Sequence, residues 1–373
     1  MHTTTLSAGA SSLVDCVCEA GLYKDPYGFC VECIPGSSSP VDGQGYDACT
    51  CPGGYTQDTT IYSTPGVSCA LSLSSSGTHT CALFTDVGKI KCWGWNPLGA
   101  LGISPDDLYF WDITDMGSNL AYVDFGLNPK VVSVQAGYVH TCVLFVNGKL
   151  KCFGGNSKGE LGMGDTVNRF DSAYLKQDDS NGFVDVGFGR SVMSVYVNDR
   201  STYVILDNKQ VKSWGENDYQ QLGHHGTHIS AINFGPHRYA VRLFPVYEST
   251  MCALLNTAEL MCWGRNELKK LGMGHEETSV PMDYRLVPIS LPTGRTVVSV
   301  TGGNYIMVLL DDHTMTGWGL GVGIGAWHVV AHYVGDQLSE MGNSLTIVNI
   351  GTGRKPVQVK VVQWTTLVLL DNG

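Results

Sequence analysis

The sequence is poor in charge and has no long apolar run. Charged residues make up 15% of the 373 residues, and 34 acidic against 23 basic side chains give a net charge of −11. An acidic chain is not drawn electrostatically to nucleic acid or to an anionic membrane surface. No apolar run approaches the ~18 residues that a membrane-spanning helix needs. We therefore expect protein partners or neighbouring subunits, no nucleic acid, and no membrane span in this segment.

Signatures of catalysis are also missing. The sequence contains no Ser/His/Asp signature, no phosphate-binding loop and no evident pair of catalytic carboxylates. We expect no enzyme activity, no catalytic residue and no cofactor. No Asn-x-Ser/Thr sequon occurs, so N-glycosylation is not expected, although Ser/Thr-rich stretches leave O-glycosylation and glycan contacts open.

Amphipathic helical patterns of useful length are absent, and a strand-rich repeat takes their place. The segment "HTCVLFVNGKLKCFGGNSKGELG" (140–162) recurs with variation along the chain. Its copies align on five glycines that are 49 to 61 residues apart: Gly94, Gly154, Gly215, Gly264 and Gly319. A sixth copy, "TTLVLLDNG", stops at residue 373. Periods near 50 residues with several short strands each indicate a propeller or a similar array.

Each repeat also has β-branched runs upstream of its hairpin, such as "VVSVQAG" (131–137) and "VMSVYV" (192–197). These runs follow a short turn such as Asp124-Phe125-Gly126, and the residues before the turn ("AYV", "GFV") are candidates for a fourth strand. Four antiparallel strands per unit make one propeller blade. The expected fold is all-β, a β-propeller with five complete repeats and a partial sixth.

These motifs resemble the regulator-of-chromosome-condensation repeat over residues 67–373. Gly155-Asn156, Gly159, Leu161 and Gly162 match its G-x-N-x-x-G-x-L-G stretch, and Gly137, His140 and Thr141 match the upstream half. The resemblance implies a propeller, usually of seven blades. It does not fix the function, because this fold serves nucleotide exchange, UV-B sensing, enzyme inhibition and scaffolding. The residues Trp93, Phe153, Trp214, Trp263 and Trp318 share one repeat position, where packing explains them better than a chromophore cluster.

Six of the 13 cysteines lie in the repeats as pairs, both present or both absent. The pairs are Cys81/Cys92, Cys142/Cys152 and Cys252/Cys262, whereas the third copy has Tyr203 and Ser213 and the fifth has Met307 and Gly317. A three-residue turn at Val146-Asn147-Gly148 with Gly148 left-handed places residues 142 and 152 opposite each other. We predict three disulfides, and hence an oxidising compartment. Buried free thiols are the alternative.

Other side chains are candidates for metal binding. His224, His225, His228 and His237 cluster in one inter-blade loop, and the acidic loops "SPDDLYFWDITD" and "KQDDSNGFVD" contain potential calcium ligands. The acidic spacing does not match an EF-hand, and His79 and His140 recur at one repeat position. We therefore expect no metal site and a structural role for these two histidines.

Residues 16–69 form a separate segment with seven cysteines and almost no apolar core, so disulfides must hold its shape. Its C-x-C and C-x-x-C-x-P-G stretches resemble EGF-like and TNF-receptor-like modules. That resemblance implies the pairs Cys18–Cys30, Cys33–Cys49 and Cys51–Cys69, and leaves Cys16 unpaired or with an external partner. Zinc at Cys30 and Cys33 is the alternative, which an oxidising compartment disfavours.

The expected organisation is an N-terminal segment (1–15), a cysteine-rich module (16–69) and a propeller (70–373) that is incomplete at its C-terminus. With five and a half repeats and an odd cysteine, we expect the chain to belong to a larger polypeptide or assembly. The predicted function is an extracellular or cell-surface structural and interaction protein, with binding loops at 103–120, 163–182, 273–292 and 320–346. A secreted inhibitor or receptor ectodomain, and a carbohydrate-active or exchange enzyme, are the alternatives.

Overall fold

The structure, a computed structural model, describes most of residues 72–371 and five short strands near the N-terminus. These strands are β1 (Thr3–Thr4), β2 (Val17–Cys18), β3 (Leu22–Lys24), β4 (Cys30–Glu32) and β5 (Gly43–Gln44). The rest of residues 1–71 and both termini lie outside the described residues, as do 86, 104–108, 111–115, 117–118, 128–129, 179–181, 248, 274–278, 281–287, 321–332, 352, 363 and 372–373. The pairings predicted for residues 16–69 therefore fall outside what the structure describes.

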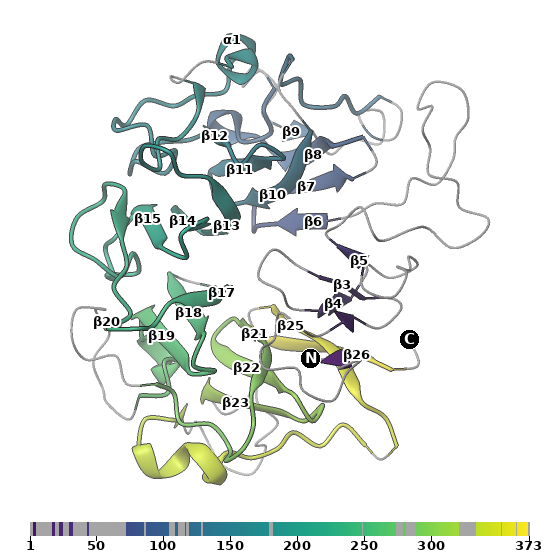
Figure 1. Ribbon diagram of the computed structural model, residues 1–373, viewed down its shortest axis with the longest axis vertical. Coiled ribbons are helices and arrows are strands. Elements are labelled where there is room, and N and C mark those ends of the chain that lie inside the picture. Colours follow the sequence, from purple (N-terminus) through teal and green to yellow (C-terminus); the bar gives the residue numbers. More distant parts are fainter. Residues whose placement is uncertain are drawn as a thin grey trace.

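Six antiparallel sheets follow one another around a central axis (Figure 1). Blades 1 and 2 contain β6 (Ser72–Ser75), β7 (His79–Phe84), β8 (Lys89–Trp95) and β9 (Tyr109–Phe110), then β10 (Val131–Ala136), β11 (His140–Phe145) and β12 (Leu150–Gly154). Blades 3 and 4 contain β13 (Val192–Asn198), β14 (Ser201–Leu206), β15 (Val211–Gly215) and β16 (Ser230–Ala231), then β17 (Ala240–Val246), β18 (Thr250–Leu255), β19 (Leu260–Arg265) and β20 (Ser279–Val280). Blades 5 and 6 contain β21 (Val297–Gly302), β22 (Tyr305–Leu310), β23 (Met315–Leu320) and β24 (Tyr333–Val334), then β25 (Pro356–Val362) and β26 (Thr365–Leu370).

The all-β propeller is confirmed: blades 1, 3, 4 and 5 have four strands, and the partial sixth blade has two described strands. Blade 2 has three strands and a single bridge between Gly154 and Arg169, followed by the short helix α1 (Ser172–Lys176). The fourth strand was expected at "AYV" (121–123), but in blade 1 it lies further upstream, at β9. Residues 121–123 instead contribute one backbone bond, from the Val123 amide to the Ile90 carbonyl (3.0 Å).

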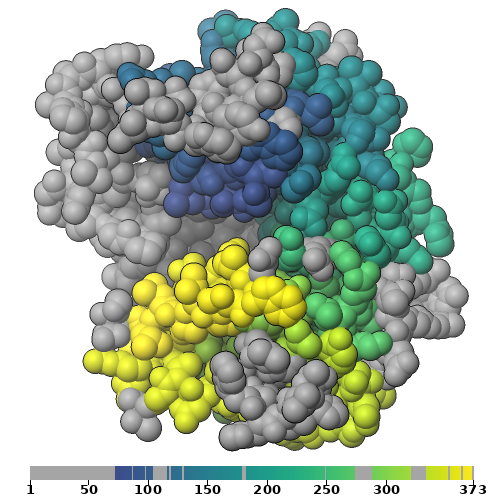
Figure 2. Space-filling view, turned by 180° about the vertical axis from the view of Figure 1, so that it is seen from behind, coloured from purple at the N-terminus to yellow at the C-terminus, as the bar shows by residue number. Residues whose placement is uncertain are grey.

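The core lies between neighbouring blades. The first strand of each blade contacts the first strand of the next blade, so these strands surround the axis. The second strands of the four middle blades, β11, β14, β18 and β22, are buried at every residue. Because both faces of a blade are covered, these strands read as near-continuous apolar runs. The colours progress around the rear face from blue to yellow in Figure 2. Among the described residues, no helix is both long and apolar enough to cross a bilayer.

In blades 1 to 5 the hairpin of the second and third strands is closed by a turn with one left-handed residue. Gly148 has φ 76°, and the same turn position is left-handed in the other blades, at Gly88, Lys209, Ala258 and His313. This turn sets the register that places Cys142 directly opposite Cys152. The structure links both of these cysteines by a disulfide, and likewise links Cys81 to Cys92 and Cys252 to Cys262.

Non-reducing peptide mapping should recover three linked pairs of peptides and no free thiol from the propeller. Each bridge closes a loop of 10 or 11 residues. Reduction should therefore lower the free energy of unfolding by about 2–3 kcal/mol per bridge in the chain-entropy model, measured by urea denaturation with and without a thiol reductant. Alkylation of any of the six cysteines in freshly isolated protein would contradict the pairing.

Two buried histidines connect neighbouring blades. The hydroxyl of Thr202 donates its hydrogen to the Glu160 carbonyl (3.0 Å). It must therefore accept a hydrogen bond from Nε2–H of His140 (2.9 Å). In the same way, His79 Nε2 lies 2.7 Å from the Thr141 hydroxyl, which donates to the Ala100 carbonyl. Burial disfavours the charged form of both imidazoles and lowers the pKa of His79 to about 4 and that of His140 to about 3.

His140→Gln should make stability less dependent on pH between 6 and 4. A histidine whose pKa is lower in the folded protein than the unfolded value of about 6.5 stabilises the fold fully above pH ~6.5. This contribution is lost as the pH falls toward the folded pKa. Each such histidine adds up to about 1.4 kcal/mol per pH unit to the slope, which a glutamine in its place would remove while still offering an N–H to Thr202. Urea denaturation at pH 4 to 7 measures the slope, and His228→Gln, at an exposed site, is the control. An unchanged slope in the His140 variant would refute the assignment.

Candidate partner-binding face

One end of the propeller is built from the G-x-N-x-x-G-x-L-G loops, and we call it the motif face. In blades 1 to 4 the side-chain oxygen of the motif asparagine accepts a hydrogen bond from the backbone amide of the motif leucine, five residues later. The four bonds are Asn96–Leu101 (3.0 Å), Asn156–Leu161 (2.9 Å), Asn217–Leu222 (3.0 Å) and Asn266–Leu271 (2.9 Å). All four leucines are fully buried. The asparagine therefore closes the loop, and the leucine anchors it to the core.

The residue before each motif leucine joins its blade to the next. Its carbonyl accepts the indole N–H of the following blade at three places: Trp214 to Glu160 (2.9 Å), Trp263 to Gln221 (2.7 Å) and Trp318 to Lys270 (2.9 Å). Phe153 replaces tryptophan in blade 2, and there the Thr141 hydroxyl bonds the Ala100 carbonyl (2.7 Å). Because only the backbone is used, the side chain at this position is free to vary between Ala, Glu, Gln and Lys.

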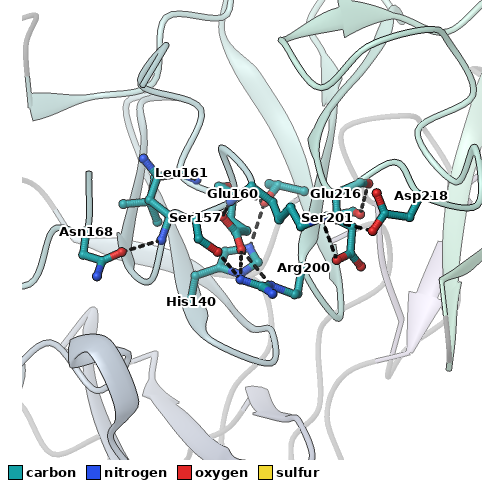
Figure 3. Close-up of polar contacts among 12 residues, drawn as sticks. His140, Ser157, Glu160, Leu161, Asn168, Arg200, Ser201, Glu216 and Asp218 are labelled. Atoms are coloured by element: carbon teal, nitrogen blue, oxygen red, sulfur yellow. Dashed lines mark hydrogen bonds and ion pairs between the residues drawn. The ribbon is translucent and has the colours of Figure 1, made fainter. Parts of the chain in front are cut away.

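Glu160 places a carboxylate at this position with no exposed side-chain surface. Its Oε2 accepts the Lys158 amide (2.6 Å), and its Oε1 accepts Nε of Arg200 (2.8 Å), which belongs to the next blade (Figure 3). The same guanidinium also donates to the Ser157 hydroxyl. Removing one partner of such a buried pair typically costs about 3–5 kcal/mol, because the remaining charge is left uncompensated.

Exposed charges continue this network outward across the boundary between blades 2 and 3 (Figure 3). Lys158 Nζ lies 3.0 Å from the Asp218 carboxylate and 4.0 Å from that of Glu216. Burial, and then the nearby charge of Asp218, raise the pKa of Glu216 above its usual value. The Lys158 and Asp218 side chains are 39% and 60% exposed, and a surface pair of this kind contributes at most about 1 kcal/mol. Both side chains can therefore change partners at little cost.

The charged surface extends into blade 4. The guanidinium of Arg265 lies over the ring of Tyr219 (4.8 Å to the centroid) and pairs with the half-exposed Glu267. Lys270 is buried at the position of Glu160 and donates to the Tyr247 carbonyl (2.8 Å). The motif face of blades 2 to 4 thus presents cations, carboxylates and one tyrosine on loops that the core anchors.

The repeat positions singled out in the sequence fall where the alignment predicts. Each aromatic residue of the W-G position pairs across its hairpin with a residue of the second strand: Trp93 with Thr80, Phe153 with Thr141, Trp214 with Thr202, Trp263 with Met251 and Trp318 with Ile306.

The histidines singled out in the sequence do not form a site among the described residues. His79 and His140 are buried between blades. In the histidine loop, His224 Nε2 lies 3.1 Å from the Ser213 carbonyl. Among the described residues, no three His, Cys, Asp or Glu side chains come close enough to hold a metal ion.

Sequence reasoning missed Arg200 and Glu160, the centre of the motif face. Long loops were expected to carry binding; 103–120 and 273–292 lie largely outside the described residues, and so does the part 321–332 of the loop 320–346. The loop 163–182 holds α1, whose last carbonyls surround Lys151: its Nζ donates to Tyr174 (3.0 Å), Leu175 (2.8 Å) and Gln177 (2.6 Å). The sequence does hold one indication of this pair. A charged residue, Glu160, precedes the Leu-Gly of one motif, and an oppositely charged residue, Arg200, precedes the hairpin of the next repeat.

Comparison with known proteins gives both a sequence and a fold relationship. Residues 131–160 match the family described as "Regulator of chromosome condensation (RCC1) repeat". The ultraviolet-B receptor UVR8 of Arabidopsis thaliana is 27% identical over 202 residues, which is 52% of this chain and 42% of UVR8. The human E3 ubiquitin-protein ligase HERC2 is 23% identical over 256 residues, 67% of this chain and 5% of HERC2. The chain thus matches less than half the length of either relative.

Solved structures share the fold at lower sequence identity. Yeast RCC1 (Prp20), crystallised with Kap60, has a TM-score of 0.63 at 18% identity, covering 81% of this chain and 68% of that one. Prp20p from Saccharomyces cerevisiae gives 0.61 at 18% identity, over 81% and 70% of the two chains. Residues 131–160 thus match one RCC1 repeat, and the blades share the fold of the RCC1-type β-propeller.

Proposed function

We propose that this protein is an extracellular or cell-surface interaction protein that binds protein partners through the motif face, without catalysis of its own. The observation that carries the proposal is the charged network centred on Glu160 and Arg200, held on loops that the core anchors. Interaction sites commonly combine a rigid frame with polar groups able to exchange partners.

The extracellular part of the proposal is supported by the hairpin disulfides. Three blades carry a buried cysteine pair at directly opposed positions, and stable disulfides belong to oxidising compartments. We also propose that residues 16–69 are a disulfide-rich module preceding the propeller at 70–373, with Cys16 unpaired or paired outside the segment. Disulfides within such a module would be stable in the same oxidising compartment.

The interaction part is supported by the chemistry of the motif face and by its relatives. The Glu160 carboxylate is occupied by the Lys158 amide and by Arg200, which suits recognition better than proton transfer. The yeast relative Prp20p is described by its binding to Gsp1p and histones and was crystallised with Kap60. This fold can therefore serve in protein binding. We expect the charged side chains of the motif face to determine which partner this chain binds.

Asp218→Lys should abolish recovery of the physiological partner from the extracellular fraction of the source cells. The substitution puts a second cation beside Lys158, breaks the exposed pair and reverses the local charge. A photo-reactive residue at position 267, on the same face, supplies the measurement, because it forms a covalent link to any partner that docks there. Cross-linked protein is then identified by mass spectrometry.

Asp207→Lys is the matched control, because Asp207 pairs with Arg190 near the hairpin turn at the opposite end of blade 3. It should leave cross-linking unchanged. Equal loss in both variants, or cross-linking that survives Asp218→Lys, would reject the motif face as the binding surface. Mass-resolved sizing of the native protein would distinguish an assembly subunit, which forms large species, from a soluble inhibitor or ectodomain.

A further inference from the structure

The opposite end of the blades, where the hairpins turn, has an open cleft that recurs in two blades. The blade 1 cleft has a volume of about 320 Å³ and is lined by Val87–Lys89, Tyr122–Gly126 and Lys130. The blade 5 cleft has about 290 Å³ and is lined by His313–Met315, Ile347–Gly351, Arg354 and Pro356. Both clefts lie between a hairpin turn and an Asx turn, in which Asp124 or Asn349 accepts an amide two residues later (2.9 Å).

Lysines gather at the blade 1 cleft, although the chain as a whole is acidic. Lys89 and Lys130 line it and are exposed. The Nζ atoms of Lys89 and Lys91 lie 5.6 and 4.8 Å from the centre of the Tyr122 ring. Lys176 of α1 pairs with Asp124 at 2.8 Å. Around this cleft the described residues therefore contribute four ammonium groups and one carboxylate.

The blade 5 cleft has a different charge, and its turn is one residue shorter than that of blade 1. Thr314 corresponds to Lys89, because each lies five residues before the aligned glycine, Gly319 or Gly94. Its one arginine, Arg354, lies 3.9 Å from the Asp371 carboxylate. Blade 2 repeats part of the cluster, since Lys149 and Lys151 face Phe183, but there Lys151 is taken up by three carbonyls and Ser191 replaces Lys130. A concave site lined by one sign of charge concentrates its field and attracts ligands of the opposite sign.

We propose that the blade 1 cleft binds an anionic glycan through its sulfate or uronate groups, with Lys89 and Lys130 as the principal contacts. Ammonium groups make short, charge-assisted hydrogen bonds to such oxygens. This site lies at the opposite end of the hairpins from the motif face, so it is independent of the protein-binding function proposed above.

The backbone around the cleft favours a glycan over an acidic peptide. The Val123 amide bonds the Ile90 carbonyl (3.0 Å), and the Val131 amide bonds the Gly88 carbonyl (2.9 Å). The Gly88 amide is likewise bonded to the Phe84 carbonyl (2.8 Å). Peptides that add to a sheet need main-chain donors and acceptors, which are already engaged here. Recognition is left to side chains, among which four ammonium groups outnumber the one carboxylate, Asp124.

Isothermal titration of the full chain with a sulfated heparin hexasaccharide and with an unsulfated hyaluronan hexasaccharide tests the proposal. Lys89→Gln/Lys130→Gln should weaken binding of the preferred glycan about tenfold, since two direct charge contacts are lost. Arg354→Gln neutralises the cation of the matched blade 5 cleft and should leave affinity within about twofold. The stronger of the two glycans identifies sulfate or carboxylate as the recognised group, and both affinities should fall with added salt.

A second measurement keeps the test independent of the variants. Bound glycan should protect Lys89 and Lys130 of the unaltered protein from acetylation and leave Lys355, which occupies the position of Lys130 in blade 6, as reactive as before. Failure of both glycans to bind, equal weakening by Arg354→Gln, or tighter binding of a hexaglutamate peptide would each overturn the proposal. The Asp218 cross-linking result is unaffected by any of these outcomes.

Discussion

The structure depends on one recurring contact: the carbonyl before each motif leucine accepts a hydrogen bond from the next blade. At Glu160 this carbonyl receives both the Trp214 indole and the Thr202 hydroxyl, and at Gln221 it receives the Trp263 indole and the Tyr203 hydroxyl (2.7 Å). These donors and acceptors are buried, so leaving any of them unpaired would cost about 1–3 kcal/mol. The contact fixes how each blade is placed against its neighbour, and the turns, core leucines and histidine bridges are arranged around it.

A frame held by backbone carbonyls leaves its side chains available for specific chemistry. The x-L-G position carries alanine, glutamate, glutamine and lysine in successive blades, all buried, without disturbing the contact between blades. The central ion pair of the motif face comes from this position and from the residue before the next hairpin, and the motif loops add the outer charges Lys158, Glu216 and Asp218. At the other end of the blades, the residue after the turn varies from Lys89 to Thr314, and the turn itself is one residue longer in blade 1. Both ends can therefore diverge separately in this repeat.

Much of the fold could be predicted because it repeats, and much of the candidate site could not because it does not repeat. The hairpin register followed from the Gly148 turn and the alternation around Cys142 and Cys152. The Glu160–Arg200 pair joins two residues 40 positions apart, and its formation depends on how blade 3 rotates against blade 2, which no periodicity encodes. The two-residue outer strands, such as β9, were misplaced because two residues carry no apolar pattern.

The disulfides lie within blades and never between them, since each links neighbouring strands of one hairpin. The contacts between blades are entirely non-covalent among the described residues. A pulling force along the chain would therefore separate blades one after another while the bonded hairpins stay closed. Each disulfide keeps a loop of about ten residues closed, so roughly 35 Å of chain cannot be extended. Under load such an array would therefore yield in steps, with the strands of every bonded hairpin still linked.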